Sequence, residues 1–438
     1  MSAGDTGALT ALGAREAAAR IRDGKISPVD LVDACLDRIH ALDGRLSAWA
    51  YVDDDGARAT ASALAAEATD GRIRGPLHGV PVAIKDIIHV AGMPTTAGAR
   101  TWGHTRPTDD APVVSRLRAA GAVILGKTHT TEFAYRDPAP TRNPWNLGHT
   151  PGGSSAGSGA AVAARMVPLA LGTQTVGSIL RPAAYCGVVG FKATHGLTPT
   201  EDVIPLAWSL DHVGVFTRSV DDAALGLGVL ARRELTAAPR GAPTIAVAPQ
   251  LLERAQPETA EHVRAVAEAF ARAGARLVEV VLPASFAQLH EMGLRVLEAE
   301  TATYHAADFA RHAAEYGPGI RAAIEAGLRQ SAVEYLRANR ARLEFREAVM
   351  PLLEAHDALL SPTAPSTAPP GLASTGDAWF CAPWSSAGVP AISLPSGLAP
   401  SGLPHAVQLV GAAGRETPLL GTAAWCESVL GFTAAPAL

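Results

Sequence analysis

The chain has 438 residues, of which 48% are hydrophobic and 18% charged, and its formal net charge is −5 at pH 7. A chain of this composition can bury a large core, which excludes intrinsic disorder for most of it. The slightly acidic balance and the lack of a basic stripe argue against nucleic acid as a partner.

Neither the N-terminal residues nor the apolar runs suggest contact with a membrane. The first ten residues have no basic segment followed by an apolar run, so we expect no signal peptide. The apolar run 160–172 is interrupted by Arg165 and Pro168, too early for a membrane span. The sequence has four cysteines, and they show neither the spacing of metal ligands nor a Cys-x-x-Cys pair. They are Cys35, Cys186, Cys381 and Cys426. We therefore predict a cytoplasmic protein with free buried thiols and no metal.

The first half of the chain alternates between predicted helices and strands. Residues 27–46 begin with Ser-Pro and continue with apolar residues three and four apart, which predicts a capped amphipathic helix. The run GVPVAIK predicts a buried strand that ends at Lys85. Further buried strands are predicted within 116–128, 167–173 and 187–194, and a helix over 157–166.

The second half continues the alternation. We predict a strand in 242–250, a helix and then a strand in 258–283, mainly helix over 286–350, and strands in 357–365 and 389–397. Residues 361–376, rich in Pro, Gly, Ser and Thr, are expected to form the rim of an active site. Strands that are apolar on both faces are typical of a sheet covered by helices on both sides. We predict an α/β protein: one α/β/α sandwich with a mixed, mostly parallel, twisted sheet, forming a single domain over residues 1–438.

The segment TPGGSSAGSGAAVAA, residues 150–164, raises the question of function. Its residues 153–157 match G-x-S-x-G, the nucleophile elbow of α/β-hydrolases, with Ser155 at the centre. That motif needs a strand directly before it, and residues 141–150 contain a proline, two asparagines and a glycine instead. A phosphate-binding loop would need Gly-Lys-Ser/Thr after the glycines, and none follows.

A second Gly/Ser cluster, residues 171–183, offers another interpretation. Ser178 follows Ser154 by 24 positions, a gap that fits a short helix and a returning strand and allows both serines to stand on one sheet edge. The small, turn-prone residues 175–178 can aim successive N–H groups at a developing oxyanion. A serine nucleophile also needs a base.

Lys85 is the best candidate for that base. His149 and His195 flank the two clusters, but no recognisable motif supplies either with an orienting carboxylate. Lys85 stands at the carboxyl end of a predicted strand, where ligands bind in open α/β sheets. Burial can lower a lysine pKa from about 10.4 by up to about 3–5 units. Only four lysines occur among 37 basic residues, so a lysine kept in an apolar run is notable, because arginine cannot lose its proton.

These residues resemble the amidase signature family. The resemblance covers about residues 15–427, with a signature core at about 75–225 and a C-terminal part at about 240–430 that completes the sheet and pocket. The segments that carry it are 77–99, 126–135, 152–164, 170–196, 209–222, 357–365, 387–397 and 405–416.

The resemblance implies a Ser-cis-Ser-Lys triad without a cofactor. Ser178 matches the nucleophile, Ser154 the bridging serine joined to Gly153 by a cis peptide bond, and Lys85 the base. The backbone N–H groups expected to hold the oxyanion are those of Thr175, Val176, Gly177 and Ser178. Ser155 is expected to be structural, and Asp86 to point away from Lys85 by strand alternation and to anchor backbone.

The sequence departs from the commonest family pattern, G-T-D-x-G-G-S-I-R-x-P. Gln174 replaces the aspartate, Val176 replaces a glycine, and Leu180 occupies the arginine position, with Arg181 one place later. The triad positions are unchanged. The departures concern the hydrogen bonds around the turn and any role of that arginine toward substrate.

The resemblance implies a serine hydrolase that cleaves the C–N bond of a small amide, with aryl amides, carbamates (urethanes) and esters as further substrate classes. We expect the pocket to be built from loops near 129–150 and 200–210 and from the C-terminal third. One alternative is the glutaminase (A) subunit of a tRNA-dependent amidotransferase, which needs partner subunits. Another is a catalytically silent binding protein on the same fold. We expect a monomer or homodimer.

Overall fold

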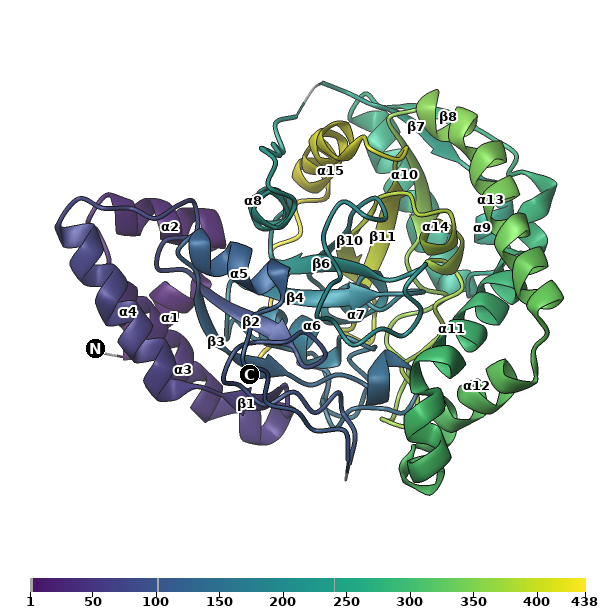
Figure 1. Ribbon diagram of the computed structural model, residues 1–438. Helices are drawn as coiled ribbons and strands as arrows, with labels where there is room; N and C mark the ends of the chain where they lie inside the picture. Colours follow the sequence, from purple (N-terminus) through teal and green to yellow (C-terminus); the bar gives the residue numbers. More distant parts are fainter. Residues whose placement is uncertain (1–2, 101, 240) are drawn as a thin grey trace.

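The computed structural model describes residues 3–100, 102–239 and 241–438, and in these ranges eleven strands form one sheet. In chain order the strands are β1 (Trp49–Val52), β2 (Pro81–Lys85), β3 (Val123–Thr128), β4 (Leu169–Gln174), β5 (Val189–Lys192), β6 (His212–Thr217), β7 (Thr244–Val247), β8 (Arg276–Glu279), β9 (Ala358–Pro362), β10 (Ala391–Leu398) and β11 (Pro404–Val410). Their order across the sheet is β1-β3-β2-β4-β6-β5-β10-β11-β9-β7-β8. Both halves of the chain therefore contribute to a continuous sheet (Figure 1).

Helices cover both faces of this sheet. The α-helices are α1 (Ala3–Ala11), α2 (Ala14–Arg22), α3 (Pro28–Leu46), α4 (Asp54–Thr69), α5 (Pro112–Ala119), α6 (Ala156–Ala163), α7 (Leu180–Cys186), α8 (Val220–Ala231), α9 (Pro249–Leu252), α10 (Pro257–Arg272), α11 (Leu289–His312), α12 (Pro318–Arg329), α13 (Ala332–Glu354), α14 (Ala382–Ser386) and α15 (Glu416–Leu430), with short 3-10 turns η1 (Glu132–Ala134), η2 (Ala284–Gln288) and η3 (Ala313–Glu315). Figure 1 shows α8 and α15 on one side of the sheet and α6 and α7 on the other. Helices α11, α12 and α13 pack together at one end of the molecule. The predicted α/β/α layering is confirmed.

Local sequence signals place several of these elements correctly. The Ser27 hydroxyl accepts a hydrogen bond from the Val29 N–H at 3.1 Å and caps α3, and Pro28 is its first residue. The apolar run that ends at Lys85 forms β2, and all five of its residues are buried. Gly274 stands between α10 and β8 with a φ of +106°, a conformation that other residues rarely adopt.

The prediction of a mostly parallel sheet is wrong. The strand pairs β2–β3, β2–β4, β7–β8 and β7–β9 are parallel, whereas the other six pairs are antiparallel. Apolar residues on both faces of a strand indicate that helices cover the sheet on both sides. They carry no information on the direction of the strand. Strands β10 and β11 show this, because only residues 399–403 join them and so short a connection requires an antiparallel pair.

The parallel trio β3-β2-β4 brings three strand ends to one edge of the sheet. Ile84 pairs with Leu171, so the next residue of β2, Lys85, lies beside the end of β4. Strand β6 runs antiparallel to β4 and begins at this edge, where His212 pairs with Gln174. Side chains from three separate segments therefore meet where Lys85 ends its strand.

Alternation along the strand separates Lys85 from its neighbour Asp86, as the sequence predicts. The Asp86 carboxylate forms a buried ion pair with Lys127 at 2.9 Å. It also accepts hydrogen bonds from the N–H and the hydroxyl of Thr96. Asp86 and Lys127 thus anchor the loop after β2 to β3 and leave Lys85 without a carboxylate partner in contact.

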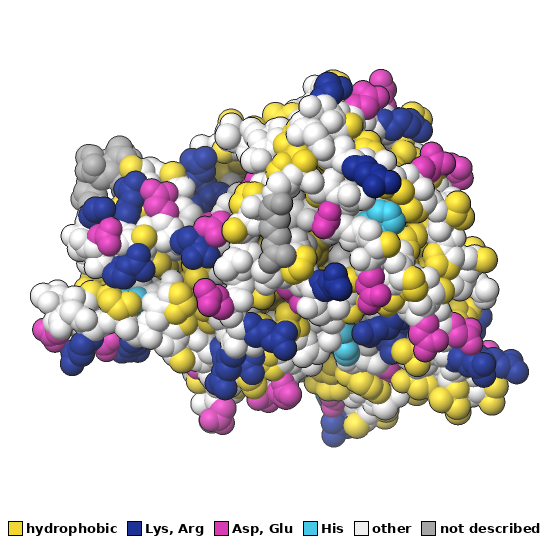
Figure 2. Space-filling model, turned by 90° about the horizontal axis from the view of Figure 1, so that it is seen from above, with side chains coloured by type: hydrophobic (Ala, Val, Ile, Leu, Met, Phe, Trp, Pro, Cys, Tyr) yellow, Lys and Arg dark blue, Asp and Glu magenta, His cyan; other side chains and the backbone are white. Residues whose placement is uncertain are grey.

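The surface carries charges of both signs. On the face drawn in Figure 2, basic and acidic side chains are interspersed, and neither sign forms a continuous field. Of the helices in the described ranges, none combines the length and the apolar character that crossing a bilayer would require.

The buried ion pair gives a stability prediction. Asp86→Ala leaves the Lys127 ammonium buried and unpaired, which should lower the free energy of unfolding by about 3–5 kcal/mol. The double variant Asp86→Ala/Lys127→Met should recover part of that loss, since it removes the unpaired charge. Melting temperatures from circular dichroism measure both effects, and Arg340→Ala, which removes a surface ion pair, is the matched control. A Lys127 without structural role would make Asp86→Ala and the double variant melt alike.

Candidate active site

Lys85 is a fully buried basic residue at the carboxyl edge of the parallel strands. Its side chain is 0% exposed. The Nζ atom lies 2.6 Å from Ser154 Oγ and 2.7 Å from Thr173 Oγ1. Both partners are neutral hydroxyl groups, so no contacting anion compensates a positive charge on the amine.

This environment sets the protonation state of Lys85. Burial lowers the pKa of Lys85 well below 10.5, and the attraction of Asp211 opposes that effect only in part. A lysine kept from water without an ion pair favours its neutral form. The amine can then accept a proton, which an exposed lysine cannot do at neutral pH.

The Gly/Ser segment brings Ser154 to this lysine. The peptide bond between Gly153 and Ser154 is cis. A Cβ atom at Gly153 would lie 2.7 Å from a methyl carbon of Thr375 and 3.0 Å from one of Thr131, so only glycine fits there. Ser155 is 0% exposed, and its Oγ is hydrogen-bonded to both the N–H and the C=O of Thr173 at 3.2 Å.

These contacts decide against the nucleophile elbow. No described strand directly precedes Ser155, and its hydroxyl is held by the backbone of β4, away from solvent. Its N–H donates to the C=O of Ser178 at 3.4 Å, which joins the two Gly/Ser clusters. These contacts are those of a buried serine that joins backbone segments.

Ser178 lies in the turn between β4 and α7, at the wall of a pocket. Its side chain is 7% exposed, whereas Ser154 is 0% exposed. Thr175, Val176, Gly177 and Ser178 all line the pocket. Within the described chain, no hydrogen bond engages the N–H groups of Val176, Gly177 and Ser178. The turn thus presents unengaged donors beside the Ser178 hydroxyl.

Gln174 holds that turn and accounts for one departure from the family pattern. Its side-chain oxygen accepts the N–H groups of Ile179 and Leu180, at 2.8 and 2.9 Å, and so caps α7. Its side-chain nitrogen donates to Ser385 Oγ at 3.0 Å, and that hydroxyl donates to the C=O of Val176 at 2.8 Å. The amide of Gln174 is therefore hydrogen-bonded on both sides of the turn. Its NH₂ group donates to Ser385, which a carboxylate at this position could not do because it has no donor.

Arg181 lies one place after the usual arginine position of the family, and the resemblance assigned no role to it. Its guanidinium donates two hydrogen bonds to the C=O of Gly153, at 2.6 and 3.2 Å, and one to the C=O of Gly376 at 2.6 Å. The side chain is 7% exposed, and burial lowers its pKa. Arg181 therefore fixes the peptide group before Ser154 and ties it to the loop after β9. Leu180, in the position of the usual arginine, is buried in the apolar core.

Asp211, which no sequence motif singles out, supports the same turn. Its carboxylate accepts a hydrogen bond from the Thr175 hydroxyl at 2.5 Å and from the N–H groups of Leu206 and Ala207. Burial raises the Asp211 pKa to about 7. Its place directly before β6 could have indicated this role, because β6 starts at the edge where β4 ends.

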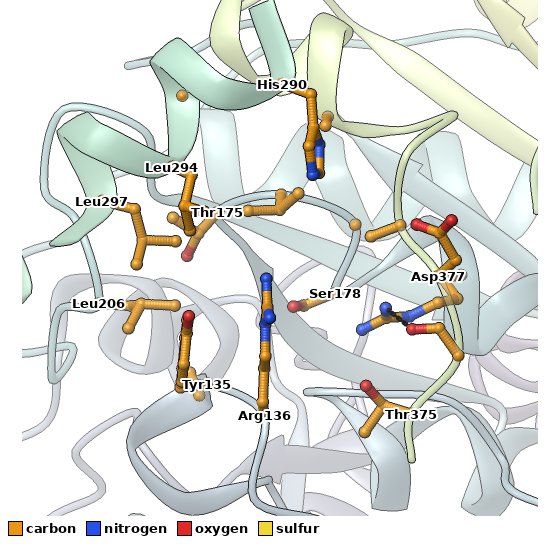
Figure 3. A pocket seen from close by; sticks show the side chains of 18 of the residues that line it. Tyr135, Arg136, Thr175, Ser178, Leu206, His290, Leu294, Leu297, Thr375 and Asp377 are labelled. Carbon is orange, nitrogen blue, oxygen red and sulfur yellow. Dashed lines mark hydrogen bonds between the residues drawn. The ribbon is translucent and has the colours of Figure 1, made fainter. Parts of the chain in front are cut away.

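The pocket beside Ser178 has a volume of about 420 Å³. Its lining comes from the loop after η1, the turn before α7, residues 206 and 210, helix α11 and residues 373–386. Residues 373–376 of the stretch 361–376 are among the lining residues, as are residues from the expected loops and the C-terminal third. Figure 3 shows apolar side chains on one side, Leu206, Leu294 and Leu297, and Ser178 and Asp377 on the other.

The structure joins some predicted site residues directly and others through the backbone. Lys85 and Ser154 are in contact, whereas no hydrogen bond links the Ser154 and Ser178 hydroxyls among the residues described. Thr173, the second partner of Lys85, was missed because a threonine in an apolar strand gives no signal of its own. In the described ranges, no group of three His, Cys, Asp or Glu side chains is arranged to hold a metal ion.

Comparisons with known proteins show the family of the chain. The Amidase family model matches residues 30–420. The glutamyl-tRNA(Gln) amidotransferase (A) subunit of Anaeromyxobacter sp. (strain K) is 38% identical over 98% of each chain. An amidase of Pseudomonas putida is 38% identical, over 82% of this chain and 80% of its own. The crystal structure of the peptide amidase of Stenotrophomonas maltophilia superposes with a TM-score of 0.82 at 31% identity, covering 98% of each chain.

The chain belongs to the amidase family. A fold and a family match of this extent identify an enzyme that hydrolyses carbon–nitrogen bonds adjacent to a carbonyl group.

Gln174 gives a prediction specific to this chain. Gln174→Met removes both the cap on α7 and the link to Ser385, so the turn should shift and the reaction of Ser178 with a phosphonofluoridate should slow by roughly tenfold to hundredfold. Ser385→Ala keeps the cap and should slow it less. The rate is measured by intact-protein mass spectrometry. A Gln174→Met protein that reacts at the wild-type rate would show that the cap does not position the turn.

Proposed function

We propose that the protein is a serine amidase in which Ser178 is the nucleophile, Ser154 the proton relay and Lys85 the base. The observation that carries the proposal is the buried Lys85 amine, 2.6 Å from Ser154 and without an ion-pair partner in contact. Such a lysine serves as a base near neutral pH. The N–H groups around Ser178 that make no hydrogen bond within the described chain can donate to the negative charge that develops on the carbonyl oxygen of the substrate.

The first half of the proposed reaction forms an acyl-enzyme. Neutral Lys85 accepts a proton from Ser154, which accepts one from Ser178, and Ser178 Oγ bonds to the carbonyl carbon of the amide. The oxyanion is held by the N–H groups of Thr175, Val176, Gly177 and Ser178. When the C–N bond breaks, the relay returns a proton to the leaving nitrogen, which departs as ammonia or an amine.

The second half regenerates the enzyme. Water gives a proton to the same relay and attacks the acyl carbon. The ester bond to Ser178 breaks, its oxygen regains a proton, and the carboxylic acid leaves. The step from Ser154 to Ser178 requires their hydroxyls to come within hydrogen-bond distance, and such contacts commonly tighten when substrate fills the site.

The proposed substrates are small amides, with carbamates as a second class. Peptide amidases and subunits of amidotransferases are both among the similar proteins, so the relatives alone do not fix the substrate. We favour an enzyme that acts without partner subunits, as a monomer or homodimer, because Gln174, Val176 and Leu180 depart from the commonest pattern. Glutaminase activity that appears only with partner subunits would favour the amidotransferase alternative instead. We also propose that residues 1–438 act as one catalytic unit in the cytoplasm.

Labelling tests the nucleophile and its base. A phosphonofluoridate forms one phosphorus–oxygen bond to an active serine and releases fluoride, so intact-protein mass should show a single adduct on the wild type. Ser178→Ala should abolish it, and Lys85→Ala should slow it by about 10²–10⁴-fold. Ser155→Ala, at a second buried serine in the same segment, is the matched control and should still be labelled on Ser178.

The opposite labelling results would reject the assignment. An adduct that survives Ser178→Ala, or that moves to Ser155, would return the elbow motif to consideration. A wild-type protein that never reacts, although it is folded, would favour the catalytically silent binding protein.

The lowered pKa of Lys85 predicts a pH profile. Only the neutral amine accepts a proton, so the labelling rate should rise with pH as Lys85 deprotonates, with a midpoint well below 10.5. Lys192 and Asp211 have pKa values of about 7 and titrate in the same range. Lys192→Met and Asp211→Asn should therefore keep the rising limb, and Lys85→Ala should lose it. A limb that disappears in Lys192→Met but remains in Lys85→Ala would contradict the assignment of the base.

A further inference from the structure

Arg136 is a cation inside the pocket without a protein partner. Its side chain lines the pocket, and Figure 3 shows it extending into the middle, between Ser178 and the apolar side formed by Tyr135 and Leu206. Among the described residues its guanidinium has no hydrogen bond and no ion pair. Its one recorded contact is with the Tyr135 ring, 5.3 Å from the ring centroid.

The two carboxylates nearest to Arg136 in the sequence are engaged elsewhere. Glu132 accepts the N–H of Gly317 at 3.1 Å. Asp137 accepts the N–H groups of Gly319 and Ile320, both at 2.8 Å. These acids cap the N-terminus of α12, where the helix dipole favours negative charge. They therefore fix the loop on both sides of Arg136 and leave its own charge unpaired.

The rest of the pocket does not neutralise this charge. Asp377 is the one carboxylate in the lining, and its Oδ1 accepts the N–H of Trp379 at 2.8 Å. Arg181 adds a second positive charge, since its contacts are to backbone carbonyl groups. Glu298 feels the field of Arg136, but no described contact pairs them. Two cations thus face one carboxylate.

We propose that Arg136 binds a carboxylate carried by the substrate, so that the preferred substrates are amides or carbamates with an anionic group beyond an aliphatic segment. This inference rests on the proposed function. A guanidinium presents a planar fork of donors that matches a carboxylate. Leu206, Leu294 and Leu297 supply the apolar surface against which the aliphatic segment packs. Arg136 and the leucine side chains would together favour substrates that carry a negative charge, in addition to the C–N bond that is cleaved.

A matched pair of ligands tests the proposal without turnover. Hexanamide and the monoamide of adipic acid have the same six-carbon chain and differ in a terminal methyl or carboxylate. Isothermal titration calorimetry on Ser178→Ala protein, at low ionic strength, measures both dissociation constants. The adipic monoamide should bind about tenfold to hundredfold more tightly, as expected for hydrogen bonds to a charged group.

Substitution of Arg136 tests whether this residue causes the preference for the adipic monoamide over hexanamide. Arg136→Gln in the same background should bring the two dissociation constants to within about twofold, and Arg136→Lys should keep part of the difference, because a lysine retains the charge but not the fork. Arg272→Gln, which removes an exposed arginine on α10, is the matched control and should keep the full preference. Added salt should weaken binding of the adipic monoamide, since Arg136 is exposed.

Several results would overturn the proposal. Equal affinities, no measurable binding of the adipic monoamide, or a preference that survives Arg136→Gln would each show that Arg136 does not select a carboxylate. Failure of the proposed function can be distinguished from failure of this inference, because it would appear as a wild-type protein that the phosphonofluoridate does not label on Ser178.

Discussion

The burial of Lys85 between two hydroxyl groups is the constraint on which the site depends. A lysine is expensive to bury as a cation, and here its contacts, Ser154 and Thr173, are neutral. The folded state therefore favours the neutral amine, whereas the unfolded chain keeps the proton up to a pKa of about 10.4. It follows that this group lowers stability at neutral pH, and that stability rises with pH between the depressed folded pKa and the unfolded one. The same effect that costs stability would allow Lys85 to act as the base that we propose.

The surrounding residues keep that geometry rigid by using backbone groups as partners. Gln174 caps α7 with its amide oxygen, Arg181 holds the C=O of Gly153, and Asp211 accepts the Thr175 hydroxyl. The contacts of the Gln174 amide oxygen are local, whereas those of Arg181 and Asp211 join segments 28 and 36 residues apart in the sequence. The pocket in front of Ser178 is assembled from the other half of the chain, through α11 and the loop after β9. The proposed catalytic residues and most of the pocket lining thus come from different parts of the chain.

Much of the fold could be predicted from the sequence, and the sequence also indicates which residues to propose for the reaction. Strand β2, the helix cap at Ser27 and the loop at 361–376 have local signals, and Asp86 follows from alternation. Strand direction could not be predicted in the same way, because an apolar strand covered on both faces reads alike in parallel and antiparallel pairs. The contact of Gln174 with Ser385 and those of Arg181 with the C=O groups of Gly153 and Gly376 reach distant parts of the chain, which no local pattern specifies. Arg136 illustrates the same limit, since its unpaired charge follows from the use of Glu132 and Asp137 at α12.

The charge of Lys85 is the most direct test of this account, and the sequence makes it accessible. With only four lysines, protein labelled with ¹³C and ¹⁵N at lysine gives four side-chain signals in an NMR pH titration, and the one lost in Lys85→Met is that of Lys85. We predict that this signal has the chemical shift of a neutral amine at mildly alkaline pH, because burial lowers the pKa of Lys85 well below 10.5. A Lys85 signal that remains that of an ammonium ion up to about pH 10, near the ordinary lysine pKa, would contradict the central claim.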